Sequence, residues 1–320
     1  MEFETAQRLS HALRKNIGEV IKGQESVLDL IVMTIMARGH ILLESVPGEG
    51  KTLAASALAA SISDVSIGRI SGQPTLKPND LTGAEIPEEH GGKFRLVKGP
   101  LFNNIVLFDE LNRTDPRTQS ALLEAMQERQ VTIGDETYAL DRPFLVLATQ
   151  NPIEQEGTYP LPEAQMDRFM FKLNISYPSR SEEREIMDRV DLLHETTVSP
   201  VVTKTEVMEA REVVNQIYVD DKAKNYIVDI VQATRNPEKF GMDIGHWIEY
   251  GASPRATIYL QQAARALAFM QGEGNVFPND VKQVAMDILR HRVVCTYEAE
   301  AEEVTSEDVI RKILDSVPVP

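Results

Sequence analysis

Five short apolar segments in the first half of the chain place the strongest constraint on its fold. They lie at residues 41–43, 66–70, 105–108, 144–148 and 170–175. A strand of a parallel sheet is buried on both faces, so it is apolar along its length, and these segments have that character. Helical patterns at residues 53–61 and 116–129 lie between them. The first half therefore predicts an α/β fold with a parallel sheet covered by helices on both faces.

The second half lacks comparable segments and follows a helical period instead. The helical patterns lie at residues 182–193, 205–214, 221–235, 256–271 and 278–291. Pro178, which precedes the first of them, marks the expected hinge because proline interrupts regular structure. The sequence therefore predicts two domains, an α/β domain of residues 1–178 and a helical domain of residues 179–320.

Two further segments predict β-hairpins inserted into the first domain. One spans residues 85–98 and turns at His90-Gly91-Gly92, and the other spans residues 130–142 and turns at Gly134-Asp135-Glu136. Glycine and aspartate favour such turns. Inserted hairpins are either contact surfaces for partners or neutral insertions, and the sequence is compatible with both.

The composition excludes several classes of protein. The net charge of -16 repels a nucleic-acid backbone, so nucleic acid is an unfavourable partner, although one face or a central pore could still be basic. No apolar run reaches the ~20 residues needed to span a bilayer. The first residues, Met1-Glu2-Phe3-Glu4, lack the blocks of a secretory signal. The single cysteine, Cys295, can form neither an internal disulfide nor a thiolate metal site. We therefore expect a cytoplasmic protein without a membrane span.

A phosphate-binding loop is predicted where the first apolar segment ends. The sequence Ser45-Val46-Pro47-Gly48-Glu49-Gly50-Lys51-Thr52 fits the pattern G-x-x-x-x-G-K-[ST] at every position except the first. Gly48 and Gly50 allow backbone N–H groups to close around phosphate oxygens. Lys51 then meets the β- and γ-phosphates, and Thr52 offers a hydroxyl to Mg²⁺. The predicted ligand is a nucleoside triphosphate, taken to be ATP, with Mg²⁺.

Polar side chains follow the third and fourth apolar segments. Asp109 and Glu110 come directly after residues 105–108, and Asn151 follows residues 144–148. Open α/β sheets bind ligands at the carboxyl ends of their strands. We expect Asp109 to hold Mg²⁺ through its water shell, and Glu110 to orient or deprotonate the attacking water. Asn151 either holds that water or the γ-phosphate, or only caps the turn before Pro152.

Two arginines are candidates for phosphate contacts. In Gly251-Ala252-Ser253-Pro254-Arg255, Ser253 is expected to cap a helix, which places Arg255 at the positive end of the helix dipole. A nearby anion would relieve that conflict, and a nucleotide phosphate is the favoured one, although exposure to solvent would also relieve it. Arg168 precedes the last apolar segment and either reaches a phosphate across a subunit boundary or pairs locally with Asp167 or Glu163.

These motifs resemble those of the MoxR family of AAA+ ATPases. Besides the phosphate loop, the resemblance is carried by residues 108–113, 119–128, 148–164 and 251–255, and it covers nearly the whole chain. The sequence departs from the usual family loop at Ser45 and at Glu49, where an apolar residue is common. Those two departures affect the expected strength of nucleotide binding rather than its nature.

The resemblance implies an αβα core with a five-stranded parallel sheet, a helical lid, and ATP bound between them in a ring of six subunits. It implies that Asn151 is the sensor 1 residue, Arg255 the sensor 2 arginine, and Arg168 the arginine finger acting on a neighbour's nucleotide. Residues 20–24 would lie near the adenine, and the hairpins would be the helix-2 and pre-sensor 1 inserts. The expected nucleotide-binding set is Gly23, Gln24, Ser45, Val46, Pro47, Gly48, Glu49, Gly50, Lys51, Thr52 and Leu53, with Thr52 and Asp109 at the metal.

The resemblance also implies a chaperone-like role in remodelling, assembling or activating client proteins, often with a partner that carries a von Willebrand factor A domain. Two alternatives stay open. A helicase-like or magnesium-chelatase-like motor subunit is opposed by the acidic composition. A scaffold in which ATP serves only for assembly is opposed by the presence of Lys51, Asp109, Glu110 and Asn151.

Overall fold

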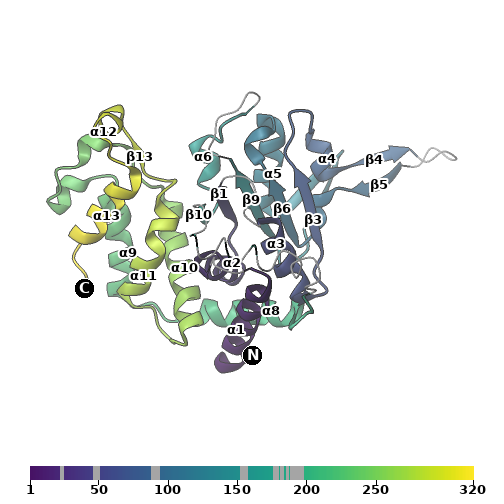
Figure 1. Cartoon of the computed structure of the whole chain (residues 1–320), viewed down its shortest axis with the longest axis horizontal. Coiled ribbons are helices and arrows are strands. Elements are labelled where there is room, and N and C mark those ends of the chain that lie inside the picture. Colours follow the sequence, from purple (N-terminus) through teal and green to yellow (C-terminus); the bar gives the residue numbers. More distant parts are fainter. Residues whose placement is uncertain are drawn as a thin grey trace.

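A central sheet of five parallel strands organises the computed structural model (Figure 1). The structure describes residues 1–21, 25–45, 51–87, 94–151, 158–175 and 198–320, together with residues 180, 184 and 187. The strands pair in the order β10-β1-β9-β6-β3, and every pair is parallel. Their bounds are Ile41–Ser45 (β1), Ile67–Ser71 (β3), Ile105–Asp109 (β6), Leu145–Gln150 (β9) and Phe171–Ile175 (β10). The predicted fold class and the five-stranded sheet are confirmed.

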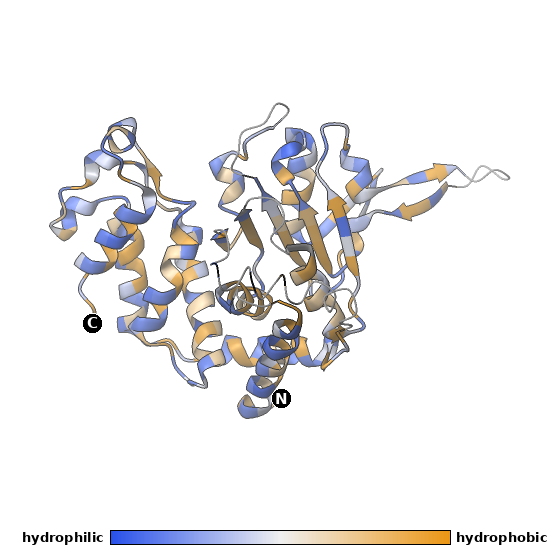
Figure 2. Cartoon of the chain, in the orientation of Figure 1, coloured by the Kyte–Doolittle hydropathy of each residue, from blue (hydrophilic) through white to orange (hydrophobic). Residues whose placement is uncertain are grey.

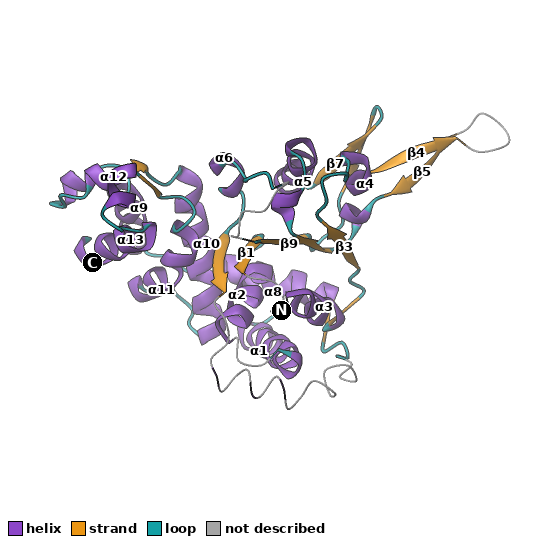
Figure 3. Ribbon diagram, turned by 45° about the horizontal axis from the view of Figure 1, so that its top comes forward, coloured by secondary structure: helices purple, strands orange, loops and turns teal. Residues whose placement is uncertain are grey.

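The two faces of the sheet pack into separate hydrophobic clusters, because successive side chains of a strand point to opposite sides. Leu43 of β1 lies in the larger cluster and its neighbour Leu42 in the smaller one. Helices cover both faces: α1 (Phe3–Val20), α2 (Glu25–Met36) and α3 (Lys51–Ala60) on one side, and α5 (Pro116–Glu128) on the other (Figure 3). In Figure 2 the strands are largely apolar, α1 and α5 carry many hydrophilic residues, and α2 is largely apolar.

The helices α1 and α2 were not predicted, and they connect the two halves of the chain. Asn16 of α1 donates a hydrogen bond from its Nδ2 to the carbonyl oxygen of Ser199, at 2.8 Å. Nearby, β11 (Val202–Thr203) pairs in parallel with β2 (Ile62–Ser63), and α8 (Lys204–Gln216) packs on α1. Residues 199–216 thus lie against the α/β part of the chain.

Both expected hairpins are present. The strands β4 (Gly83–Pro87) and β5 (Phe94–Lys98) pair antiparallel and project from the body at the right of Figure 1, while their turn lies outside the described residues. The second hairpin joins β7 (Gln130–Ile133) to β8 (Glu136–Ala139). Its turn contains Gly134 at a φ of +61°, a conformation that glycine adopts without steric cost.

A C-terminal helical unit, residues 221–317, lies at the left of Figure 1. It contains the helices α9 (Asp221–Ala233), α10 (Pro254–Gln271), α11 (Pro278–Leu289), α12 (Tyr297–Ala301) and α13 (Ser306–Ser316). The helical expectation missed a small antiparallel pair, β12 (Ile248–Tyr250) with β13 (Val294–Cys295). Pro178, the expected hinge, lies outside the described residues, as does most of the pattern at 182–193. No helix in the described part of the chain is long and apolar enough to cross a membrane.

Candidate nucleotide-binding and hydrolysis site

The predicted phosphate loop begins and ends as expected. Strand β1 ends at Ser45, and α3 begins at Lys51. Residues 46–50, Gly23 and Gln24 lie outside the described part of the chain, and so do the side chains of Ser45, Lys51 and Thr52. Leu53 is partly buried against the larger hydrophobic cluster. The loop therefore connects the carboxyl end of a central strand to the amino end of a helix, where backbone N–H groups favour an anion.

Asp109 and Glu110 lie at the carboxyl end of β6 and are joined by the side chain of Thr149. The Thr149 hydroxyl donates to Asp109 Oδ1 at 2.5 Å, and the Glu110 backbone N–H donates to the same hydroxyl at 2.8 Å. Thr149 was not predicted, because it lies within an apolar strand, where a hydroxyl is not conspicuous. Its two hydrogen bonds fix the Asp109 carboxylate relative to the neighbouring strand β9.

The backbone turns sharply at Glu110, which has a left-handed conformation (φ 53°, ψ 51°). Such a conformation is uncommon for a residue other than glycine and is found at functional sites. Gly72 accommodates the turn, since a Cβ atom at this position would lie 2.0 Å from the Glu110 carbonyl oxygen. The turn directs the chain away from the strand immediately after the two acids.

The Glu110 carboxylate is paired with Arg113 on the next turn of the chain. Arg113 Nη1 lies 2.7 Å from Glu110 Oε2, and both side chains are partly exposed. An ion pair of this kind holds the carboxylate in a fixed direction without burying it. In this state Glu110 is therefore oriented by Arg113.

Asn151 directly follows β9, so it lies at the same edge of the sheet as the two acids. Its backbone carbonyl accepts a hydrogen bond from Asn112 Nδ2 at 3.1 Å, and the Asn112 carbonyl accepts one from the Tyr159 N–H at 2.6 Å. Gln119 Nε2 donates to the Tyr159 carbonyl at 3.1 Å. These contacts hold the segments that follow β6 and β9 together, so that Asn151 and Glu110 keep a fixed relation.

A polar network next to the phosphate loop was not predicted. Glu44, the residue before Ser45, accepts from Lys172 Nζ of β10 at 2.7 Å and from the Gln150 side-chain amide of β9. Glu44 and Gln150 lie at the carboxyl ends of their strands, whereas Lys172 is the second residue of β10. A search for polar residues at strand ends would have found Glu44 and Gln150 but not Lys172.

Arg168 lies just before β10, at the amino-terminal edge of the sheet. Its Nη1 donates to the Leu123 carbonyl at 3.0 Å and to the Gln127 side chain. Within the described residues it makes no ion pair with Asp167 or Glu163, the local partners that spacing allowed. Arg168 therefore lies against the end of α5.

Arg255 lies in the first turn of α10, as expected, and Ser253 caps that helix by accepting from the Arg255 N–H at 3.2 Å. The anion that faces Arg255 is Asp167: Arg255 Nη1 lies 2.8 Å from its Oδ2, and the Ser253 hydroxyl donates to the same oxygen at 2.9 Å. Arg292 Nε donates to the other oxygen, Oδ1, at 2.7 Å. One carboxylate of the α/β part thus binds two arginines of the C-terminal helical unit.

We expect Asp167→Asn to lower the free energy of unfolding by about 2 kcal/mol, because it removes the charged acceptor of a buried guanidinium. The Arg292 side chain is 1% exposed, and burial lowers its pKa although Asp167 opposes that shift. A lower melting temperature measures the effect. Asp243→Asn, which changes an exposed carboxylate of the C-terminal helical unit, is the control, and equal melting temperatures for the two variants would contradict this role of Asp167.

The candidate residues thus lie at two opposite edges of the sheet. The phosphate loop, Asp109, Glu110 and Asn151 follow the carboxyl ends of strands, whereas Arg168 lies before the amino end of β10 and Arg255 is bound to Asp167 beside it. A strand of five residues separates these edges by roughly 13–16 Å, at about 3.3 Å per residue. The structure therefore places Asp109, Glu110 and Asn151 at the same edge of the sheet as the carboxyl end of β1, and the two arginines at the other edge.

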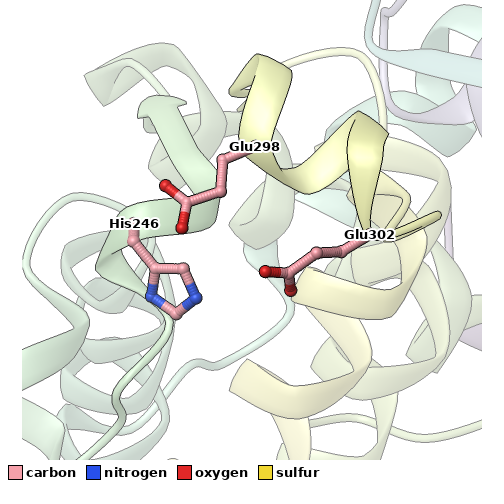
Figure 4. Close-up of side chains that lie close together, drawn as sticks. All are labelled: His246, Glu298 and Glu302. Carbon is pink, nitrogen blue, oxygen red and sulfur yellow. The ribbon is translucent and has the colours of Figure 1, made fainter.

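A second group of ligand-type side chains lies within the C-terminal helical unit (Figure 4). One ligand atom each from His246, Glu298 and Glu302 lies within 4.8 Å of the others. All three residues are exposed, and Glu302 accepts a hydrogen bond from Trp247 Nε1 at 2.9 Å. This contact accounts for the position of Glu302.

Comparison with known proteins defines the class of the chain. Residues 40–171 match the family described as "ATPase family associated with various cellular activities (AAA)", and residues 244–313 match the AAA lid domain. The two matches cover the phosphate loop, both acids and Asn151 on one side, and Arg255 on the other. The chain is therefore built as an AAA ATPase with a lid.

Relatives over the full length identify the family. Chaperone MoxR1 of Mycobacterium tuberculosis is 43% identical over 314 residues, which cover 97% of this chain and 83% of that protein. The uncharacterized protein YeaC of Bacillus subtilis is 42% identical over 307 residues, 96% of this chain and 93% of that protein. A crystal structure of a protein assigned as an ATPase, from Cytophaga hutchinsonii, is 45% identical with a TM-score of 0.93 and covers 99% of this chain and 97% of its own. The chain belongs to the MoxR family of AAA+ ATPases.

Proposed function

We propose that this chain hydrolyses ATP with Mg²⁺ at the interfaces of a homo-oligomeric ring, with six subunits as the expected size. The observation that carries the proposal is the division of the candidate site between two edges of the sheet. A subunit that holds the phosphate loop at one edge and two arginines at the other has half of a site on each side. Head-to-tail assembly joins complementary halves, and a ring closes the series.

In this proposal the carboxyl-terminal edge binds the nucleotide and activates water. Lys51 meets the β- and γ-phosphates, and Glu110 accepts a proton from water as the water oxygen attacks the γ-phosphorus. The bond from that phosphorus to the bridging oxygen breaks, which gives ADP and phosphate. Asn151 holds the water or the γ-phosphate in line.

The residues present fit a magnesium ion. Mg²⁺ prefers hard oxygen ligands, and the sequence supplies the Thr52 hydroxyl and the Asp109 carboxylate, of which Thr149 binds only Oδ1. When bound, the ion neutralises charge on the β- and γ-phosphate oxygens. Thr149 fixes the Asp109 carboxylate through Oδ1 and leaves Oδ2 for other partners.

Arg168 and Arg255 act on the nucleotide of the neighbouring subunit. Arginine suits this role because it is always charged and presents several donors to a phosphate. In the single chain, Asp167 neutralises Arg255, and carbonyl and amide oxygens bind Arg168. These contacts hold both side chains in position before the neighbouring subunit binds.

The ATPase cycle would remodel client proteins in the cytoplasm, with a partner that has a von Willebrand factor A domain. The name of the M. tuberculosis relative, a chaperone, supports this role. The β4–β5 hairpin offers a contact surface, since Ile86, Phe94 and Val97 are 47%, 66% and 38% exposed. Exposed apolar residues on a projecting element are typical of binding surfaces.

A mixture of two inactive variants tests the shared site. Arg168→Ala and Lys51→Ala are each expected to reduce ATPase activity at least about a hundredfold, since an arginine finger contributes ~10³–10⁵ to turnover. Mixed rings should regain part of the wild-type rate, because a Lys51→Ala subunit still donates Arg168 to an adjacent Arg168→Ala subunit. Steady-state ATPase assays at concentrations where light scattering detects rings measure the recovery.

Two outcomes contradict the shared site. Full activity of Arg168→Ala alone would show that Arg168 takes no part in ATP hydrolysis. Failure of the mixture to recover, despite subunit exchange shown by fluorescence energy transfer, places Arg168 in the site of its own subunit.

A further inference from the structure

A cavity of about 380 Å³ lies at the amino-terminal edge of the sheet. Four arginines line it: Arg38 before β1, Arg129 after α5, Arg168 before β10 and Arg255 at the start of α10. His40 and Tyr259 are among its other lining residues. Its size is at the lower end of the ~300–1,000 Å³ range of small-ligand pockets. The two proposed nucleotide-contacting arginines thus share one cavity with two further arginines.

The cavity is short of negative charge, although the chain as a whole carries -16. Arg38 pairs with Glu212 at 2.5 Å and Arg255 with Asp167 at 2.8 Å, but no carboxylate within the described residues pairs with Arg129 or Arg168. Burial and the charges of Arg142 and Arg38 lower the pKa of Arg129. Like charges in a partly buried place repel each other, so an anion would stabilise this cluster.

A fifth guanidinium lies close to the cluster. Arg211 is 3% exposed, and its Nε donates to the Ile35 carbonyl at 2.6 Å. Burial, together with the charges of Arg38, Arg129 and Arg142, lowers its pKa to about 9. At neutral pH it therefore adds positive potential to the cluster.

Arg129 is held in a defined position by its surroundings. It closes α5 with a left-handed φ of 54°, and its N–H donates to the Ala125 carbonyl at 2.9 Å. Burial lowers the pKa of His40 to about 3, so this ring is neutral. The Val146 N–H donates to His40 Nδ1 at 2.9 Å, which leaves the ring hydrogen on Nε2, 3.3 Å from the Met126 carbonyl. The end of α5 is thereby fixed to the sheet.

The Arg129 guanidinium itself has little to bind in the single chain. Among the described residues it makes one side-chain hydrogen bond, from Nη2 to the Arg38 carbonyl, at a long 3.4 Å. Arg129 is partly buried, its backbone is fixed at the end of a helix, and its guanidinium makes only one long hydrogen bond. A guanidinium in this situation is available to bind an anion from another molecule.

We propose that Arg129 is a third arginine on the phosphates of the neighbouring subunit's nucleotide, beside Arg168 and Arg255. The inference rests on the proposed ring ATPase, because the phosphate loop of the same chain lies at the opposite edge of the sheet. The positive charge of Arg129 stabilises the negative charge on the phosphate oxygens during phosphoryl transfer.

Arg129→Gln tests the proposal, since glutamine keeps hydrogen-bonding capacity and removes the charge. We expect kcat for ATP to fall about tenfold to a hundredfold, within the span seen when a single stabilising donor is removed. The affinity of the unassembled subunit for ATP stays at the wild-type value. Mixing Arg129→Gln with Lys51→Ala regains part of the activity, and Arg129→Lys retains more activity than Arg129→Gln.

Arg142→Gln is the matched control. Arg142 contributes to the electrostatic shift of Arg129 but does not line the cavity, so its variant should keep kcat within about twofold. A melting temperature for each variant shows whether the end of α5 is intact.

The outcomes separate the inference from the proposed function. An active wild type with an equally active Arg129→Gln overturns the inference alone. A slow Arg129→Gln that the Lys51→Ala subunits do not rescue, despite subunit exchange, overturns its action on the neighbour. A wild type without ATPase activity contradicts the proposed function, and the inference with it.

Discussion

Lys51→Ala is expected to lose ATP binding while the protein stays folded. The lysine ammonium is the compact cation that meets the β- and γ-phosphates, and removing one partner of a buried charge pair costs about 2–5 kcal/mol of binding. Affinity should therefore fall at least about thirtyfold. Calorimetry with ATP and Mg²⁺ measures it.

The control for this variant is Lys15→Ala, which removes an exposed lysine of α1. It should bind ATP like the wild type. A folded Lys51→Ala protein with wild-type affinity would falsify the assignment of residues 45–52 as the phosphate loop.

Glu110→Gln is expected to bind ATP and to turn it over at least about a hundredfold more slowly, the usual contribution of a general base being ~10²–10⁴. Glutamine keeps the size of the side chain but cannot accept the proton of the attacking water. The fold should tolerate the change, because the Glu110–Arg113 pair is partly exposed, and such pairs contribute little to stability. Single-turnover kinetics with labelled ATP measure the chemical step.

Glu124→Gln, on the exposed side of α5, serves as its control and should leave the rate unchanged. If Glu110→Gln retained the wild-type single-turnover rate, another group would have to accept the proton. Asp109 is the nearest carboxylate along the chain, and it would become the next residue to test.

The central sheet could be predicted because each of its strands is buried on both faces. A segment such as residues 105–108, apolar at every position, has few alternatives once a turn and a helical pattern follow it. Helix α2 was not predicted for a related reason. It is buried on nearly all sides, so its sequence lacks the alternation of apolar and polar residues that identifies a helix. The pair β12–β13 is too short to leave a pattern, and tertiary contacts decide its structure.

Some residues of the candidate site could likewise be predicted from the sequence, and others could not. Asp109 and Glu110 are detectable because two acids after an apolar strand have no place in a core. Thr149, which fixes Asp109, is neutral in pattern and becomes visible only through strand pairing. The partner of Arg255 could not be predicted either. An anion close to Arg255 in space was expected, but Asp167, which fills this role, lies 88 residues away along the chain. Contacts between distant segments cannot be read from spacing.

The polarity of the parallel sheet has a consequence for mixed populations of subunits. If each subunit completes two sites, one through its loop and one through its arginines, a chain defective at both edges, such as Lys51→Ala combined with Arg168→Ala, silences its own site and its neighbour's. A site then works only when two adjacent chains are both intact. Activity of randomly mixed rings should fall as the square of the intact fraction, so that defective chains lower the activity by more than their share of the mixture.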